Sequence, residues 1–395
     1  MDFLAEARNI EPELIRTRRL LHRRPELSYH ELATAKIVAD RLESLGIRVK
    51  TGVGETGVVG VLKGRKKGKV VGLRADMDAL PIEEAAEVEF RSRVRGVMHA
   101  CGHDTHVAML LGAARILSEH RRELPGTVKF LFQPAEEQGG RGGAMPMIED
   151  GALKDPKVDY MFGLHIVNAY KTGEIAVREG ATMAAPDCFK MRIVGRGGHG
   201  AYPHQGVDPV YVAAQVILAL QGVSGRMINP VQPFVVSVCS VHSGTKDNIM
   251  PDDALLEGTI RTLDSNTRRV AKAKVREVAM KVSEAFGARA EVDFTEDAYP
   301  VTYNDPATTR KVAELLKGMP GVKVRVADQV MWGEDFSRFL EKAPGTFCFL
   351  GSGNKAKGCV QPNHSSKFKI DEDALKVGAA ALAMLAMSFA APKWS

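Results

Sequence analysis

The stretch HVAMLLGAARILSEH (residues 106–120) lies between two strand-like runs, VVGLRAD (70–76) and VKFLFQ (128–133). Apolar residues recur in it at three- and four-residue spacing, which predicts a helix with one buried face. The two flanking runs are short and mostly apolar, which is typical of strands in a buried sheet. A strand, a helix and a second strand in succession therefore predict an α/β layer on a central sheet.

The alternation extends in both directions from this stretch. The further segments are helical patterns over residues 5–22 and 30–45 and strand-like runs over 47–50, 57–62 and 160–166. Together they predict a mixed central sheet with flanking helices over residues 1–184.

The pattern changes after residue 184. The segments that follow are strand-like runs at 188–197, 233–244 and 254–262 and helical patterns at 208–223 and 266–287. Two helices and several strands over residues 185–297 predict a small α+β domain. A helix, a strand and a final helix then return to the first pattern over residues 298–395. We therefore expect the small domain to be inserted into a catalytic domain of class α/β, split between 1–184 and 298–395.

Length and composition allow two domains of ordinary globular type. The chain has 395 residues, of which 45% are hydrophobic, and this is enough apolar content for two cores. Its first residues, MDFLAEARN, lack the pattern of a signal peptide, and no segment has 18 consecutive apolar residues. We expect a cytoplasmic protein without a membrane partner, in which the uncharged run 377–391 is a helix packed on the protein body.

Charge and cysteine content exclude other classes of protein. The 54 Lys and Arg residues nearly balance the 48 Asp and Glu residues, which leaves a net charge of +6. The densest basic run, KGRKKGK (63–69), has no aromatic residues that could stack on bases, so we expect a solvated turn and no nucleic-acid partner. Five scattered cysteines cannot form a disulfide framework and are expected to be reduced. Two G-x-G-x-x-G patterns, at 52–57 and 195–200, are not followed by helices and are predicted to be turns.

Candidate chemical groups lie at the ends of predicted strands. Glu136 and Glu137 follow the strand at 128–133, and His165 lies at the end of the strand at 160–166. Ligands bind at the carboxyl ends of strands in open α/β sheets, so these side chains are well placed to form a site. One of two adjacent acids could bind a metal while the other accepts a proton from water. A solvated acidic loop and a core histidine are the alternatives for these residues.

The segment HACGHDTH (99–106) opens the predicted helix. Asp104 is expected to be the N-cap, which leaves Cys101 and His103 in the loop before the helix N-terminus. The positive end of the helix would lower the pKa of the Cys101 thiol toward the thiolate that a metal requires.

Four side chains of this segment are of types that can bind a metal, but we do not expect all four to do so. We predict that Cys101 and His103 are ligands and that His99 and His106 are bystanders, so that His106→Ala leaves metal binding nearly intact. Together with the strand-end carboxylates and imidazole, the thiolate forms the ligand chemistry of Zn²⁺, or of Mn²⁺, Co²⁺ or Ni²⁺. His364, in NHSSKF, lies in a polar loop and carries little information by itself.

These motifs resemble the M20 metallopeptidases, and within them the amidohydrolase branch that includes aminoacylases, hippurate hydrolases, indole-acetyl-amino-acid hydrolases and some carboxypeptidases. The matches run in order over almost the whole chain and are HRRPELSYHE (22–31), LRADMDALPI (73–82), MHACGHDTHVAMLLGAA (98–114), LFQPAEE (131–137), GLH (163–165), GGHGAYPH (197–204), GTKDNIMP (244–251), GTIRT (258–262), GEDFS (333–337) and NHSSKF (363–368). The resemblance implies that the inserted domain is a lid or dimerisation domain, and that the protein forms a homodimer or homotetramer through it.

The resemblance also implies a site for two divalent ions, with Zn²⁺ the first expectation and Mn²⁺, Co²⁺ or Ni²⁺ the alternatives. The implied ligands are Cys101, which would bridge the ions, His103, Glu137, His165 and His364. Glu136 would be the general base, and Asp78 would position a ligand. The chain has Asp76 and Asp78 where the wider superfamily has His-x-Asp, so it departs from that pattern.

Three residues of the inserted domain match positions that contact substrate in relatives. His199 would stabilise the oxyanion, often from across a dimer, and one such donor is worth about 3 kcal/mol. Asn248 and Arg261 would hold the free carboxylate of the substrate, a group that an arginine fork suits. The resemblance therefore implies hydrolysis of N-acyl-L-amino acids, or of blocked and short peptides, with release of the C-terminal amino acid.

Other interpretations stay open. Carboxypeptidase action on short peptides and deacetylation of N-acetyl-diaminopimelate would use the same chemistry. A non-catalytic metal-binding protein or a thiol redox protein would belong to a different class. Against that class, Glu136 and His199 are both present and no C-x-x-C motif occurs.

Overall fold

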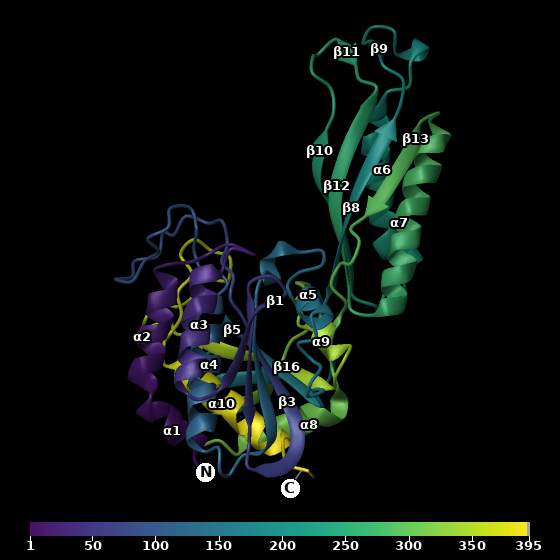
Figure 1. The fold of residues 1–395 in the computed structure, drawn as a ribbon. Coiled ribbons are helices and arrows are strands. Elements are labelled where there is room, and N and C mark those ends of the chain that lie inside the picture. The colour runs from purple at the N-terminus through teal and green to yellow at the C-terminus, as the bar shows by residue number, and fades with distance from the viewer. Residues whose placement is uncertain (393–395) are drawn as a thin grey trace. The chain divides into compact units, whose positions relative to one another are not determined.

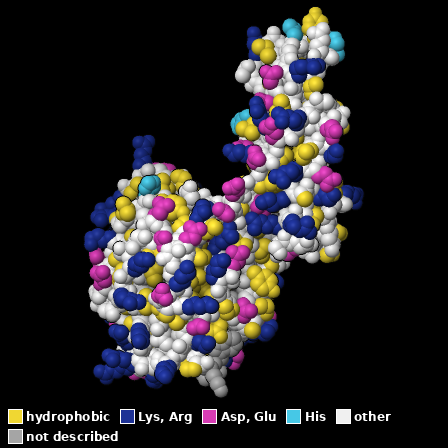
Figure 2. Space-filling view, turned by 45° about the vertical axis from the view of Figure 1, so that its right-hand side comes forward, with side chains coloured by type: hydrophobic (Ala, Val, Ile, Leu, Met, Phe, Trp, Pro, Cys, Tyr) yellow, Lys and Arg dark blue, Asp and Glu magenta, His cyan; other side chains and the backbone are white. Residues whose placement is uncertain are grey.

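The computed structural model describes residues 1–392, and the chain forms two units (Figure 1). On the face drawn in Figure 2, Lys and Arg side chains are interspersed with Asp and Glu side chains on each unit. The first unit consists of Met1–Gly180, Tyr303–Asp328 and the described part of Asp335–Ser395, and the second of Ala181–Thr302 and Gln329–Glu334. Residues 393–395 of the predicted segment 298–395 lie outside the described residues. The predicted α/β class, with a mixed central sheet, flanking helices and an inserted α+β unit, is confirmed.

An eight-stranded mixed sheet organises the first unit, in the order β1-β2-β4-β3-β5-β16-β6-β15. The strands are β1 (Arg48–Val53), β2 (Gly57–Lys63), β3 (Lys66–Asp76), β4 (Pro125–Gln133), β5 (Tyr160–Lys171), β6 (Glu174–Val177), β15 (Lys323–Val326) and β16 (Gly345–Gly353). The central strands β4, β3, β5 and β16 are parallel to their neighbours in this group. Their carboxyl ends therefore meet at one edge of the sheet, which is where a site is expected.

Helices cover this sheet and supply most of the core. They are α1 (Phe3–Asn9), α2 (Glu11–His22), α3 (Leu32–Ser44), α4 (His103–Glu119), α5 (Ala144–Glu149), α8 (Pro306–Lys317), α9 (Ser337–Leu340) and α10 (Ala374–Phe389). α4 is buried along nearly its whole length and packs against α2 and α10. This central position fixes the N-terminus of α4 against the sheet, next to the carboxyl ends of the parallel strands.

Two expectations for these helices were wrong. The single helix expected over 5–22 is divided at Ile10, because Pro12 has no amide hydrogen to continue the first helix and instead lies in the first turn of α2. Asp104 is not the N-cap of α4: the helix begins at His103 after Gly102, whose φ of 89° is left-handed. The Asp104 carboxylate is instead bound to Arg18 and His22.

The second unit is a four-stranded antiparallel sheet, β10-β12-β8-β13, with helices packed on one face. Its elements are β8 (Ala185–Val194), β9 (Gly198–His199), the 3-10 turn η2 (Pro203–Gln205), α6 (Pro209–Gly222), the π-turn η3 (Val223–Met227), β10 (Phe234–His242), β11 (Ile249–Met250), β12 (Asp253–Thr262), α7 (Ser265–Ala285) and β13 (Arg289–Phe294). β9 and β11 pair as a separate two-stranded ribbon (Figure 1). Two short strands, β7 (Gly180–Met183) and β14 (Thr302–Asn304), lie where the chain passes between the units.

One helical segment of the described chain has the length and composition of a membrane span. It is Pro209–Met227, with a mean hydropathy of 1.2, and 28% of it is buried inside the structure. The buried side of α6 packs on the sheet of the second unit. The run 377–391, which the sequence singled out, lies in α10 up to Phe389 and is largely buried in the core of the first unit.

Candidate metal centre

Three parallel strands and the start of α4 bring the candidate ligands together. Asp78 follows β3 by two residues, and Glu136 and Glu137 begin a short 3-10 turn, η1 (Glu136–Gln138), after β4. His165 lies within β5 and not at its end, because the strand continues to Lys171. Cys101 precedes α4, while His103 is its first residue rather than part of the loop.

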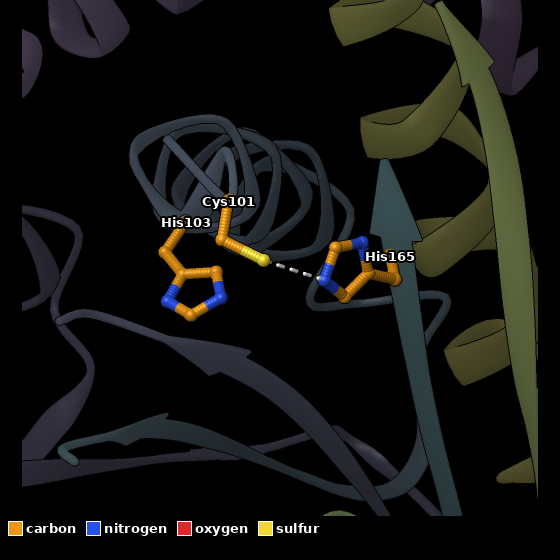
Figure 3. A group of neighbouring side chains, drawn as sticks. All are labelled: Cys101, His103 and His165. Carbon is orange, nitrogen blue, oxygen red and sulfur yellow. Dashed lines mark hydrogen bonds between the residues drawn. The ribbon is translucent and has the colours of Figure 1, made fainter. Parts of the chain in front are cut away.

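Cys101 and His165 face each other across the site (Figure 3). The Cys101 Sγ atom lies 3.3 Å from His165 Nε2. His165 Nδ1 is 2.9 Å from the Ile166 carbonyl oxygen, which can only accept, so Nδ1 carries the proton and Nε2 presents its lone pair to the site. Burial lowers the pKa of His165 well below its usual value, so the imidazole is neutral and suited to bind a cation.

His103 is held in the same way by Asp78. Its Nδ1 atom donates to the Asp78 carbonyl oxygen at 2.9 Å and lies 3.1 Å from Oδ1 of the same residue. Asp78 also accepts from Ser28 Oγ at 2.7 Å and from the Glu137 amide at 2.9 Å. Asp78 thus orients one candidate ligand and the backbone of another, which is the usual task of a residue behind a metal ligand.

The His103 Nε2 atom lies 3.3 Å from Asp76 Oδ2 and has no hydrogen-bond partner among the described residues. Burial lowers the pKa of His103, but Asp76, Asp78 and Glu137 outweigh this effect and raise it to about 10. His103 therefore carries a proton on Nε2, and a metal ion that binds this atom would have to displace it.

Glu137 and His364 complete the set. Glu137 Oε1 lies 3.1 Å from His364 Nε2 and 4.0 Å from His103 Nε2. Cys101, His103 and His165 form one group whose ligand atoms lie within 4.8 Å of one another, and Cys101, Glu137 and His364 form another. The thiol is common to both groups, so these residues could hold two divalent cations.

The environment of Cys101 differs from the expectation for a helix N-terminus. Burial raises the pKa of its thiol well above the usual value, and Glu137, Glu136 and Asp76 raise it further. The carboxylates outweigh the helix dipole because they are full charges in a buried site. The thiolate therefore requires a cation at this position.

The two other histidines of the segment lie outside the two groups that contain Cys101, although His106 forms a further candidate group with Asp76 and His103. His106 Nε2 accepts from the Ile166 amide at 2.9 Å, and Nδ1 donates to Asp76 Oδ1 at 2.5 Å, so both ring nitrogens are engaged. His99 is buried beside the His22 ring, at 6.3 Å between centroids, and burial lowers its pKa to about 4.

Sequence reasoning missed a buried ion network behind the site. Arg74 donates to Asp76 Oδ2 at 2.8 Å and to Asp335 Oδ1 at 2.9 Å. Asp335 Oδ2 accepts from the amides of Gly143 and Ala144, both at 3.0 Å, and so anchors the loop that follows Glu136 and Glu137. Arg74 stood inside an apolar strand and Asp335 within the GEDFS motif, but nothing local pairs them, since they are 261 residues apart.

Asn363 was also missed. Its side-chain amide donates to the Cys101 carbonyl oxygen at 2.9 Å and to the Ile166 carbonyl oxygen at 3.2 Å. The His364 amide donates to the Ala100 carbonyl oxygen at 2.8 Å. These bonds explain how a polar loop distant in sequence presents His364 to the site.

The other predicted residues lie in the second unit. His199 pairs with Ile249 in the β9–β11 ribbon, directly after Asn248. Its Nδ1 atom accepts from the Ala201 amide at 3.1 Å, so the proton is on Nε2, which can donate. Arg261 lies near the other end of β12 and lines a cavity together with Cys188 and Thr259.

A comparison with known families decides the class of this centre. The model of "Peptidase family M20/M25/M40" matches residues 72–388. The chain belongs to the M20 family. The resemblance inferred from its motifs is therefore confirmed, and this M20 protein is a metal-dependent hydrolase that acts on amide bonds.

Individual relatives of this M20 chain agree with that assignment. Thermostable carboxypeptidase 2 of Saccharolobus solfataricus is 52% identical, over 98% of this chain and 99% of the relative. N-acetyl-L-cysteine deacetylase of Bacillus subtilis is 39% identical, over 93% and 85%. The crystal structure of Bacillus subtilis YxeP, described as a dinuclear metal-binding peptidase of this family, has a TM-score of 0.84 and 36% identity, over 96% of this chain and 98% of that one. The donor set and this relative support a site for two divalent ions.

Proposed function

We propose that the protein hydrolyses N-acyl-L-amino acids, or short and blocked peptides, and releases the C-terminal amino acid. The single observation that carries this is the donor set around Cys101, with the second acid, Glu136, beside it. The relatives named for carboxypeptidase and for N-acetyl-amino-acid deacetylase activity support a substrate with a free carboxylate next to the amide. Carboxypeptidase action is the second candidate, because the 52% identical relative bears that name.

The proposed ligands are Cys101, His103, Glu137, His165 and His364, with Zn²⁺ as the native metal. When bound, two divalent cations supply Lewis-acid polarisation of the amide carbonyl and lower the pKa of water. Glu136 Oε takes a proton from the attacking water and delivers it to the leaving amine. Asp78 keeps His103 and the Glu137 backbone fixed during this transfer.

We assign the carboxylate of the substrate to Arg261 and Asn248 and the oxyanion to His199, whose Nε2–H is free to donate. These residues cannot all serve one amino acid within one chain. β12 begins at Asp253, next to the β9–β11 ribbon, and Arg261 lies eight residues further along the strand. Eight residues of strand span about 26 Å, which is the distance between Arg261 and the ribbon end of β12. The His199 and Asn248 end would therefore serve the site of a second copy, as in a homodimer.

A surface for that second copy is present on the second unit. β10 is an edge strand of the sheet, and α6 beside it exposes Tyr211 and Leu218, at 50% and 67% of their areas. An unpaired strand and an apolar helix face are complementary to themselves across a two-fold axis. We therefore assign 185–297 as the dimerisation domain, 1–184 and 298–395 as the catalytic domain, and the cytoplasm as the location.

His199→Ala is expected to lower kcat about 100-fold with unchanged metal content, because one oxyanion donor is worth about 3 kcal/mol. The measurement is steady-state kinetics alongside metal analysis. His204→Ala is the matched control, since His204 is an exposed histidine five residues away in the same unit. A variant that retains the wild-type kcat would remove His199 from the mechanism.

Mixing two inactive variants tests whether the site is shared. Under random exchange of subunits, His199→Ala and Glu136→Gln chains form heterodimers that each contain one intact site, which restores about a quarter of wild-type activity. If His199 acts within its own chain, the mixture stays as inactive as its components.

Metal loading is expected to weaken as the pH falls. Cys101 and His103 both hold a proton at neutral pH, because their pKa values are raised, to about 10 for His103. Loading should therefore release about two protons per chain, and the binding constant should rise about 100-fold per pH unit near pH 7. Calorimetry in buffers of different ionisation enthalpy counts these protons, and a count near zero would contradict the assigned ligands.

The substrate class is tested by reconstitution. The metal-free protein is loaded with Zn²⁺, Mn²⁺, Co²⁺ or Ni²⁺ and assayed on N-acetyl-, N-benzoyl- and benzyloxycarbonyl-amino acids beside their methyl esters. Turnover of the free acids alone supports the proposed function. Absence of turnover with every metal refutes it, and equal turnover of the esters refutes the carboxylate role of Arg261 and Asn248.

A further inference from the structure

A second cavity, of about 540 Å³, opens on the first unit among β1, β2, β4 and the segment 149–155. Val58 and Leu62 of β2 belong to the main core. Because successive side chains of a strand point to opposite faces, Val59 and Val61 point to the other face of the sheet, where this cavity lies. The cavity is thus separated from the metal centre by its position at the β1 edge of the sheet. Its floor is aliphatic.

Two cations flank this floor in register. Arg48 of β1 is paired with Val61 of β2, and Val61 is paired with Lys129 of β4. Residues paired across an antiparallel ladder point to the same face, so both cationic side chains lie on the cavity side of Val61. Their Cα atoms are about 10 Å apart, two strand spacings, which allows both side chains to reach one small anion.

Lys129 is a buried cation whose ammonium group donates to neutral carbonyl oxygens. Only 2% of this residue is exposed, and its ammonium donates to the carbonyl oxygens of Ala152, at 3.0 Å, and Lys154. No carboxylate of the described residues forms an ion pair with it, nor with Arg48. Buried charges are normally paired, so a cation that meets only neutral carbonyls beside a cavity points to an external anion.

The acidic residues of the cavity wall are mostly engaged elsewhere. Glu149 is paired with Arg141, and Asp150 accepts from the Gly54 amide at 2.7 Å. Asp155 is the remaining acid. Burial lowers the pKa of Lys129 to about 8. The Asp155 carboxylate raises this pKa, and the Arg48 guanidinium lowers it further.

We infer that this cavity binds a small aliphatic carboxylate, with its carboxylate between Arg48 and Lys129 and its apolar body on Val59 and Val61. Two kinds of molecule carry this chemistry, a short fatty acid and an aliphatic amino acid. In the second case Asp155 is the partner of the ammonium group. The site is independent of the proposed function, although both kinds of molecule are products of that hydrolysis.

The test uses the metal-loaded enzyme and two probes, hexanoate and L-leucine, with calorimetry and hydrogen exchange of residues 149–155. A bound probe is expected to protect this segment, and Arg48→Met to weaken that binding about ten-fold or more, the effect of losing one charge-assisted contact. Lys67→Met is the control, since Lys67 is an exposed cation near the start of β3 that does not line the cavity. Arg48→Met is preferred to Lys129→Met, because Lys129 also ties down the 152–154 backbone.

Each outcome decides one part of the inference. Protection by hexanoate alone identifies a fatty acid, and protection by leucine that Asp155→Asn weakens identifies an amino acid. If neither probe protects 149–155, or if Arg48→Met binds as wild type does, the inference is overturned and Lys129 only anchors its loop. Since hydrolytic activity is not the readout, failure here is distinguishable from failure of the proposed function.

Discussion

Glu136→Gln is expected to lower kcat by about 10²–10⁴-fold, because a glutamine amide cannot take a proton from water. Glu136 is buried next to His103 and Glu137, and the substitution keeps its volume. The two metal ions should therefore still bind, so that the loss is confined to the proton transfer. Steady-state kinetics with metal analysis of the same samples measures both quantities.

The control for this variant is Glu314→Gln, on the exposed surface of α8. It changes the net charge by the same amount without touching the site, and it should keep wild-type kinetics. A Glu136→Gln enzyme that is fully loaded and retains more than about a tenth of wild-type kcat would assign the base to another residue.

Cys101→Ser is expected to remove metal from both positions, so that loading falls from about two ions per chain to nearly none. The thiol belongs to both groups of candidate ligands, and a serine hydroxyl is not deprotonated as a thiol is when it meets a cation. Metal analysis after dialysis measures the stoichiometry. Loss of a single ion would show that Sγ serves only one position.

Two comparison variants bracket this result. Cys348→Ala removes another buried thiol, on β16, and should keep both ions. His106→Ala should also keep both ions, but it removes one hydrogen-bond partner of Asp76, which keeps Arg74, and the partner of the Ile166 amide. This variant is therefore expected to unfold at a lower temperature than the wild type, although His106 is not a proposed metal ligand.

The parts of the fold that follow local patterns were predictable. The helices α6 and α7 lie within a few residues of the segments expected from periodicity, because apolar spacing reports which face of an element is buried. The break at Ile10 and the start of α4 were not, since each depends on one backbone detail: the missing amide of Pro12 and the left-handed Gly102.

Some residues of the site could also be predicted from local sequence patterns, and others could not. Helix starts and strand ends can be located from the sequence pattern. This is why the sequence pointed to Cys101, His103 and the Glu136–Glu137 pair. His364 carried meaning only through the family resemblance, because its position depends on Asn363 and a bond to Ala100. Arg74 and Asp335 could not be paired from sequence, since a contact between residues 261 apart leaves no local periodicity.

The buried, carboxylate-flanked thiol of Cys101 has a practical consequence for sulfur chemistry. Alkylating and oxidising reagents attack thiolates, and this thiol is both neutral and enclosed before a cation arrives. Cys188 and Cys239, by contrast, are exposed, and both belong to the second unit. Maleimide dyes should therefore label the second unit while sparing the metal-binding thiol, and the metal-free enzyme should survive storage in air with its capacity for reactivation intact.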